Sequence, residues 1–145
     1  MVRVSCAIAI RRPATEVFAF VTDPVTSPIW HEDVLDDSGQ PGLPTGSTGV
    51  QKMLVLGQHT SITYEVILNN GVDTLTARTL RGPLRYATTL KVTPIEDMSC
   101  RVSVVTDIAI GAVFRLAEGA VQSIAEGHMM SDLERLKQTM EALVT

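Results

Sequence analysis

The sequence predicts an α+β fold in which a curved antiparallel sheet wraps around one long C-terminal helix. Three observations predict this fold. Segments in the middle of the chain alternate apolar and polar residues at period two, which is typical of half-buried strands. Short turn signals join these segments, as in an antiparallel meander. The last part of the chain changes to a period of about 3.6, which is typical of an amphipathic helix.

Length and composition are those of an ordinary globular domain. The 145 residues are 45% hydrophobic and 19% charged, with a formal net charge of −4. We therefore treat residues 1–145 as a single domain that buries about two-thirds of its unfolded surface. No run of basic residues supports nucleic-acid binding, and no apolar segment reaches the roughly 18 residues of a membrane span.

The N-terminal segment and the cysteines bear on location and cofactors. The apolar stretch at residues 2–10 precedes Arg11 and Arg12, the reverse of the order in a signal peptide, so we expect a cytoplasmic protein. Cys6 and Cys100 are isolated in the sequence, which favours two small buried hydrophobic residues. The sequence has no metal-site, nucleotide-loop or nucleophile-elbow motif, and we expect neither a metal nor another cofactor.

The opening of the chain predicts a strand followed by two short helices. Val2 to Ile10 places its larger apolar residues at every second position, as a half-buried strand does. Pro13 suits the first turn of a helix, because its missing N–H needs no partner there. Asp23 ends that helix, since the residue before a proline is pushed out of the helical region. A second short helix follows from Pro24 to Trp30.

The strands follow a loop rich in glycine and proline, Gly39 to Gly49. Further turn signals are Asn69-Asn70-Gly71 and Gly82-Pro83. The first strand after the loop is apolar on both alternate rows, so either row suits the core. The expected strands cover residues 50–58, 62–68, 73–80, 86–92 and 100–110. In the second of them the apolar row consists of Ile62, Tyr64, Val66 and Leu68.

The C-terminal segment predicts a single long amphipathic helix of about 30 residues and about 45 Å. A helix and a curved sheet touch along a line, so we expect a concave apolar space between them, which is the usual place for a small molecule. The helical stripe that faces this space consists of Phe114, Ala117, Val121, Ile124, Ala125, His128, Leu133, Leu136, Met140 and Leu143.

These elements occur in the order of a known family. The stretches that carry the likeness are IRRPATEVFAFVTDPVTSPIWHEDV, PTGSTG, ITYEV, RGPLRY and DLERLKQTMEAL. On them the chain resembles the START-like, helix-grip superfamily also called SRPBCC, and within it the bacterial polyketide cyclase/dehydrase and lipid-transport branch. The resemblance spans essentially the whole chain. It implies a helix-grip fold, with a seven-stranded antiparallel sheet around the C-terminal helix and two short helices closing one end of the cavity.

Trp30 and His31 have two interpretations. In the first they form a gate at the end of the cavity, with His31 as a proton donor or acceptor near neutral pH. In the second Trp30 packs the short helices onto the sheet, as the resemblance also implies, and His31 points to solvent beside Glu32 and Asp33.

Tyr64, Tyr86 and His128 are the candidate catalytic residues. Both tyrosines lie on apolar rows of strands, where a buried hydroxyl needs a partner and can orient a carbonyl or phenol. His128 lies on the helical stripe one turn after Ile124, where a neutral imidazole can act as a general base. The alternative for all three is an ordinary core position.

The other charged candidates are expected mostly at the surface. An arginine that points inward can bind a carboxylate or an enolate. We place most of the arginines outside the cavity, His59 in an exposed loop, and Asp107 and Glu65 on the outer face. The arginines considered are Arg78, Arg81, Arg85 and Arg115.

Three functional hypotheses follow. The first is a protein that binds a small apolar or amphipathic molecule, lipid-like or polyketide-like, between sheet and helix. The second is an enzyme of the polyketide cyclase, aromatase or dehydratase type, and the third is an interaction module with a filled cavity, for example a homodimer. The expected ligand-binding residues are Phe18, Trp30, Met53, Tyr64, Tyr86, Ile124, His128 and Met129.

Overall fold

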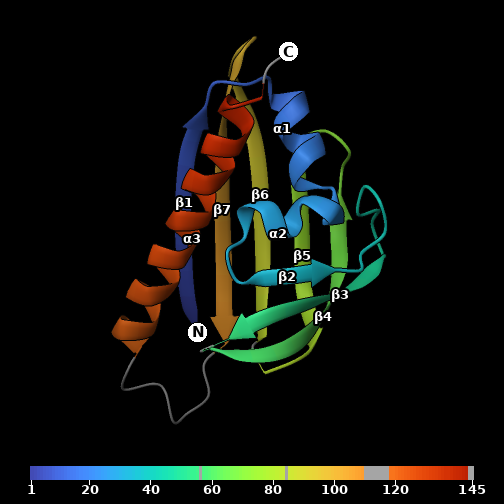
Figure 1. Cartoon of the computed structure of the whole chain (residues 1–145), viewed down its shortest axis with the longest axis vertical. Coiled ribbons are helices and arrows are strands. Elements are labelled where there is room, and N and C mark those ends of the chain that lie inside the picture. Colours follow the sequence, from blue (N-terminus) through green and yellow to red (C-terminus); the bar gives the residue numbers. More distant parts are fainter. Residues whose placement is uncertain (56, 84, 110–117, 144–145) are drawn as a thin grey trace.

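The computed structural model describes the whole chain except residues 56, 84, 110–117 and 144–145. A first strand and short helices precede a run of strands, and one long helix follows them (Figure 1). The elements are β1 Val2–Ile10, α1 Ala14–Val21, η1 Pro24–Thr26, α2 Ser27–Trp30, β2 Val34–Asp37, β3 Thr48–Val55, β4 Gln58–Asn69, β5 Thr74–Arg81, β6 Arg85–Glu96, β7 Ser99–Ala109 and α3 Glu118–Glu141.

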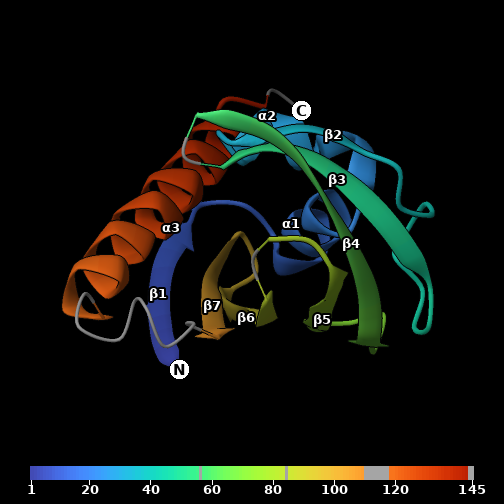
Figure 2. The ribbon, with the colours of Figure 1, turned by 90° about the horizontal axis from the view of Figure 1, so that it is seen from below.

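The strands form one seven-stranded antiparallel sheet in the order β1-β7-β6-β5-β4-β3-β2. Seen from below, the strands follow an arc, with α1 on its inner side and α3 at its open side beside β1 (Figure 2). The predicted α+β helix-grip fold is therefore confirmed. The pattern of alternation did not predict β2, because its four residues are too few to show a period.

The register of the strands defines the inner side of the arc, because cross-strand partners share a face. Val104 of β7 pairs with Cys6 of β1 and with Leu90 of β6, and Leu90 pairs with Leu75 of β5. We call this side the concave face. Its residues include Val2, Val4, Cys6, Ile8, Ile10, Val34, Asp37, Gly49, Gln51, Met53, Thr60, Ile62, Tyr64, Val66, Asn69, Leu75, Ala77, Thr79, Tyr86, Thr88, Leu90, Val92, Cys100, Val102, Val104, Thr106 and Ile108.

A β-bulge in β4 corrects one prediction. The register between β4 and β5 shifts between Val66 and Leu68. A bulge adds one residue to a strand, so the side chains beyond it change face. Val66 is fully buried, whereas Leu68 is 46% exposed. The expected apolar row of this strand therefore ends at Val66.

The short helices form where the prolines predict them. The backbone carbonyl of Pro13 accepts the first hydrogen bonds of α1 from Glu16 and Val17. The Asp23 carboxylate accepts a hydrogen bond from the Val25 N–H and thereby caps η1. The expected helix from Pro24 to Trp30 consists of one turn of 3₁₀-helix followed by the short α2.

Only the C-terminal half of helix α3 is buried. The described part of the helix has 24 residues, and the expected stripe residues Phe114 and Ala117 lie outside the described residues. Leu133, Leu136 and Met140 are almost fully buried and pack in the core with α1, β6 and β7. Ile124, in the N-terminal half of α3, is 61% exposed. The prediction of one continuous buried stripe is therefore wrong. The predicted burial of Leu143, the last residue of the stripe, is also wrong, because this side chain is 47% exposed.

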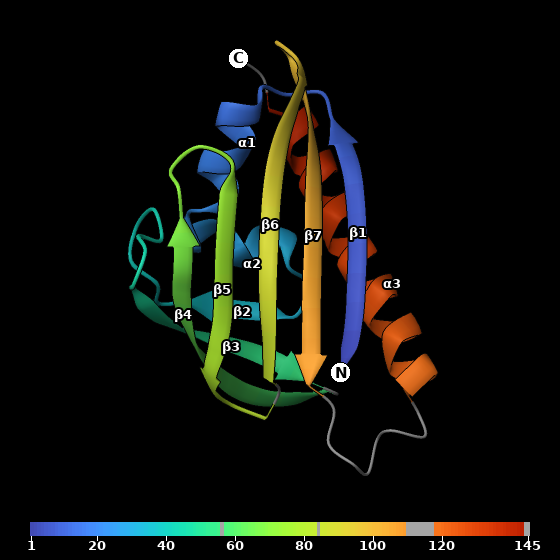
Figure 3. The same ribbon diagram turned by 180° about the vertical axis from the view of Figure 1, so that it is seen from behind.

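The N-terminal half of α3 is exposed because the helix runs alongside the edge strand β1 (Figures 1 and 3). Two side chains of α3 donate hydrogen bonds to backbone carbonyls of β1. Gln122 Nε2 reaches the Arg3 carbonyl at 3.2 Å, and Lys137 Nζ reaches the Ala9 carbonyl at 3.0 Å. These contacts satisfy acceptors that β1 would otherwise present at the edge of the sheet.

Candidate functional site

Asp37 is the centre of a polar network on the concave face. Its carboxylate accepts four hydrogen bonds, two on each oxygen. The Tyr64 hydroxyl and the Gly39 N–H donate to Oδ1 at 2.7 and 2.9 Å. The Ser27 hydroxyl and Gln51 Nε2 donate to Oδ2 at 3.0 and 3.1 Å. The network joins α2, β2, β3 and β4, and it satisfies the carboxylate of Asp37 fully.

Tyr64 reaches Asp37 because two glycines leave space for its ring. A Cβ atom on Gly39 would lie 2.1 Å from the Tyr64 hydroxyl oxygen, and one on Gly49 would lie 2.5 Å from it. Any larger residue at either position would displace the ring. Burial and the hydrogen bond to Asp37 raise the pKa of Tyr64. This hydroxyl is therefore a fixed structural donor.

Tyr86 lies on the same concave face, but its hydroxyl is free. None of the hydrogen bonds found among the described residues involves this hydroxyl, and the side chain is half-buried. Burial, and to a smaller extent the negative charge of Asp37, raise the pKa of Tyr86 to about 12. The phenol therefore stays protonated at neutral pH and can donate a hydrogen bond to a bound molecule.

Threonines make the concave face around Tyr86 mildly polar. Thr88 of β6 and Thr106 of β7 form a cross-strand pair, with their hydroxyl oxygens 2.9 Å apart. Thr79 of β5 accepts a hydrogen bond from the Tyr86 N–H at 3.0 Å. The deeper rows of the same strands are apolar, with Leu90, Val92 and Val102 buried, so a small polar area borders an apolar one.

Two histidine–aspartate contacts and one ion pair connect the loop after α2 to α3. His31 Nδ1 lies 3.0 Å from Asp132, His128 Nδ1 lies 3.3 Å from Asp33, and Arg135 lies 3.7 Å from Glu32. The three helix residues are spaced at i, i+4 and i+7, so they share one face of α3. His31 thus packs on Trp30 and pairs with Asp132, and the expectation that it points to solvent is wrong.

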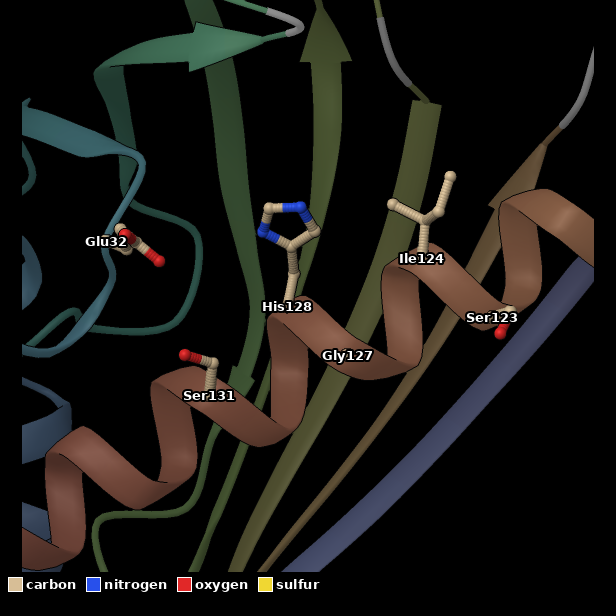
Figure 4. Close-up of a pocket in the computed structure, with 6 residues that line it drawn as sticks. All are labelled: Glu32, Ser123, Ile124, Gly127, His128 and Ser131. Atoms are coloured by element: carbon tan, nitrogen blue, oxygen red, sulfur yellow. The ribbon is translucent and has the colours of Figure 1, made fainter.

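A hollow of about 360 Å³ lies between this loop and the N-terminal half of α3. Figure 4 shows Ile124 and His128 on the same side of α3, with Glu32 on the loop after α2. Both helix residues are more than half exposed. The lining residues are Glu32, Ser123, Ile124, Gly127, His128 and Ser131.

The structure separates the predicted ligand-binding residues into three groups. Phe18 and Trp30 are buried in the core, and Met129 packs against it half-buried. Ile124 and His128 line the hollow beside α3. Met53, Tyr64 and Tyr86 lie on the concave face. Their roles in binding and catalysis stay predictions.

Sequence reasoning did not single out Asp37, Ser27 or Gln51. The strand β2 that carries Asp37 is too short to be seen in the pattern, and Ser27 and Gln51 come from two other elements, α2 and β3. The only signal was an aspartate two residues before Gly39, where the glycine-rich loop begins. That pattern is common in turns, so it does not distinguish a buried carboxylate from an exposed one.

The other charged candidates are distributed largely as expected. Arg78 pairs with Glu65, and Arg3 pairs with Asp107, both on the outer face of the sheet. His59 is exposed, although it lies at the start of β4 and not in a loop. Arg115 lies outside the described residues. Both cysteines are free, with Cys100 buried and Cys6 half-buried.

The described residues hold neither a helix suited to span a membrane nor a cluster of metal-binding side chains. They contain no helix long and apolar enough to cross a membrane. They also contain no group of three or more histidine, cysteine, aspartate or glutamate side chains placed to hold a metal ion.

Comparisons with solved structures show the same fold in proteins of low sequence identity. The Zhui aromatase/cyclase from a Streptomyces species has a TM-score of 0.78 at 13% identity, over 96% of this chain and 93% of that chain. A START superfamily protein from Mycobacterium smegmatis has a TM-score of 0.71 at 14% identity, over 96% of this chain and 94% of that chain. A protein from Thermus thermophilus has a TM-score of 0.77 at 17% identity, over 94% of both chains.

Family membership follows from the sequence itself. A search of curated proteins found no match. A family model matches residues 1–141, nearly the whole chain. The order of elements, the curled sheet and the helix-grip arrangement agree with that match. The chain belongs to the family described as polyketide cyclase / dehydrase and lipid transport.

Proposed function

We propose that the protein binds a small apolar or amphipathic molecule between the concave face of the sheet and α3. The observation that carries this proposal is the partial cover that α3 provides. Its C-terminal half buries Leu133, Leu136 and Met140, whereas Ile124 of its N-terminal half is 61% exposed. Among the described residues, the N-terminal half of α3 contributes no fully buried residue to the core, and Cys6 Sγ of β1 lies 3.9 Å from its Glu126 carbonyl.

Half-buried side chains on the concave face support the proposal. Met53, Leu75, Ala77 and Tyr86 come from three strands of the sheet, β3, β5 and β6, and are neither fully buried nor exposed. An apolar surface of this kind gains free energy when a ligand removes it from water, by about 25 cal/mol per Å². The hollow between α3 and the loop after α2 is a route by which such a ligand enters.

The test uses the fluorescence of N-phenylnaphthylamine, an uncharged dye that brightens in apolar sites. The variant Ala77→Trp places a large ring on the concave face, where Ala77 pairs with Thr88 and Val66. The matched control Ala87→Trp places the same ring on the outer face, where Ala87 is exposed. We expect wild type and Ala87→Trp to bind the dye, and Ala77→Trp to lose at least about tenfold in affinity.

Two outcomes contradict the proposal. One is that the wild-type protein does not bind the dye, and the other is that both tryptophan variants bind it like wild type. Because a tryptophan at position 77 can overpack the fold, circular dichroism and the smaller change Ala77→Leu accompany the measurement. Ala77→Leu is expected to reduce the affinity for the dye by a smaller factor than Ala77→Trp does, while the protein stays folded.

A second candidate function is catalysis of an intramolecular aldol condensation, and the free hydroxyl of Tyr86 favours it. When solvent water removes a proton from the carbon beside a ketone, the Tyr86 phenol can donate a hydrogen bond to the ketone oxygen and stabilise the resulting enolate, whose carbon then attacks the second ketone. Asp37 is an unsuitable base, since its oxygens already accept four hydrogen bonds. The likeness to an aromatase/cyclase agrees with this candidate but shows the fold alone.

Heptane-2,6-dione tests this second candidate, because its ring closure with loss of water gives methylcyclohexenone, which absorbs in the ultraviolet. We expect an enzyme to accelerate the closure and Tyr86→Phe to lose about 10²-fold of that rate. A wild-type protein that binds the diketone without accelerating its closure is a binding protein.

The cytoplasmic location and the homodimer stay predictions.

A further inference from the structure

The charges of the concave face restrict the chemistry of a ligand that binds there. Of the residues assigned to this face by the strand register, Asp37 alone is charged. The arginines and lysines of the described strands lie on the outer face or at strand ends. Arg78, for example, pairs with Glu65, and Arg81 pairs across the sheet with Thr63. A ligand on the concave face therefore meets no strand cation among the described residues.

Asp37 does not provide a free partner for a ligand either. Each of its oxygens accepts two hydrogen bonds from protein groups. Its negative charge nevertheless remains, and Tyr86 is close enough to be affected by it. An anionic ligand group beside Tyr86 would therefore lose its hydration and face a like charge.

Tyr86, unlike Asp37, has a polar group that is free to form a hydrogen bond with a ligand. Its hydroxyl has no hydrogen-bond partner among the described residues, although the side chain is half-buried. As a protonated phenol it donates one hydrogen bond, which suits a ketone, ester or phenol oxygen. Ala77 of the neighbouring strand β5, which pairs with Thr88, offers an apolar surface diagonally across from it.

We infer that the ligand is uncharged and carries an oxygen that accepts a hydrogen bond from Tyr86, and that the site rejects carboxylates. This inference rests on the proposed binding function and narrows its ligand class. It separates neutral carbonyl and phenolic compounds from fatty acids and other anions, which have equally apolar bodies. The discriminating groups are the Tyr86 hydroxyl and the Asp37 charge.

The test compares three naphthalenes that carry different groups at the same ring position. Acetylnaphthalene carries a ketone, ethylnaphthalene has nearly the same shape without a hydrogen-bonding group, and naphthoate is an anion. Each competes with N-phenylnaphthylamine for the wild-type protein. We expect the ketone to bind about fivefold to tenfold more tightly than the hydrocarbon, as one net hydrogen bond allows. Naphthoate is expected to bind at least about tenfold more weakly than the ketone.

Two variants test whether Tyr86 causes the preference for the ketone and whether Asp37 causes the rejection of the anion. Tyr86→Phe is expected to reduce ketone affinity to that of the hydrocarbon and to leave hydrocarbon affinity unchanged within about twofold. Asp37→Asn is expected to raise naphthoate affinity several-fold relative to the ketone. The matched control Thr76→Val removes a hydroxyl on the outer face, where Thr76 pairs with Thr89, and should change none of the preferences.

The outcomes separate this inference from the proposed function. If naphthoate binds as tightly as the ketone, or if Tyr86→Phe weakens ketone and hydrocarbon equally, the inference is wrong while the binding function stands. If neither the dye nor any naphthalene binds, the proposed function itself fails. The inference and the proposed function are both supported if the ketone binds more tightly than the hydrocarbon and the anion, and if Tyr86→Phe removes only the preference for the ketone over the hydrocarbon.

Discussion

At the scale of single residues, the two tyrosines show how neighbours decide the use of a side chain. Tyr64 and Tyr86 lie on the same face of the sheet. Tyr64 extends past two glycines and donates its hydroxyl to Asp37 at 2.7 Å. Tyr86 has no such acceptor among the described residues. The first hydroxyl is therefore part of the fold, and the second is available to a ligand.

Removal of each hydroxyl is expected to have a different effect on stability. Tyr64→Phe breaks a hydrogen bond to the half-buried carboxylate of Asp37, so the free energy of unfolding should fall by about 1–3 kcal/mol. Tyr86→Phe breaks no hydrogen bond and should change it by less than about 0.5 kcal/mol. Urea unfolding followed by circular dichroism measures both. Equal losses in the two variants would contradict the assigned roles.

At the scale of elements, α3 has two halves with different functions. The C-terminal half is part of the core through Leu133, Leu136 and Met140. The N-terminal half lies beside β1 and borders the hollow that Ile124 and His128 line. The side chains of His128, Asp132 and Arg135 contact the loop after α2 and connect both halves of the helix to the other side of the opening.

Truncation of one leucine and one isoleucine on α3 tests this division. Leu136 is fully buried, so Leu136→Ala should reduce the free energy of unfolding by about 2–5 kcal/mol. Ile124 is 61% exposed, so Ile124→Ala should change it by less than about 0.5 kcal/mol. Denaturant unfolding of the two variants and of wild type gives the comparison. A large loss in Ile124→Ala would show that the N-terminal half also packs on the sheet.

At the scale of the whole molecule, Glu141 ties the end of α3 to the start of the fold. Its carboxylate accepts a hydrogen bond from the Arg11 N–H at 3.0 Å, and it pairs with Lys137 and with the Arg11 side chain. Arg11 follows β1 directly, so the contact joins the end of the first strand to the last helix. The hydrogen bond from Lys137, followed by that from Arg11, lowers the pKa of Glu141.

This contact predicts a loss of stability in acid. A glutamate whose pKa is lower in the folded state stabilises the fold at pH values above its unfolded pKa, and this contribution is lost as the pH falls through the folded pKa. The Tm should therefore decrease below about pH 5, and Glu141→Gln should decrease less steeply than wild type over the same range. The control Glu134→Gln changes an exposed glutamate of the same helix and should keep the wild-type slope. Parallel curves for wild type and Glu141→Gln would contradict the assignment.

Local patterns in the sequence were sufficient to predict the fold class and most elements. Alternation at period two marks strands such as β1 and β7, and Pro13 and Pro24 mark the two helix starts, because these signals depend on neighbours in the chain. The concave placement of Tyr64 and Tyr86 also follows from alternation. The short strand β2 and the bulge at Val66 left no such signal, since both depend on pairing with other strands.

The chemistry of the site was decided by the tertiary structure. Asp37, Ser27 and Gln51 meet Tyr64 only because four elements converge there. The sequence determined that both tyrosines face inward, but alternation specifies the side of a strand and not the partner across it. Which tyrosine has a partner, and which half of α3 is covered, are set by contacts between residues far apart in the chain.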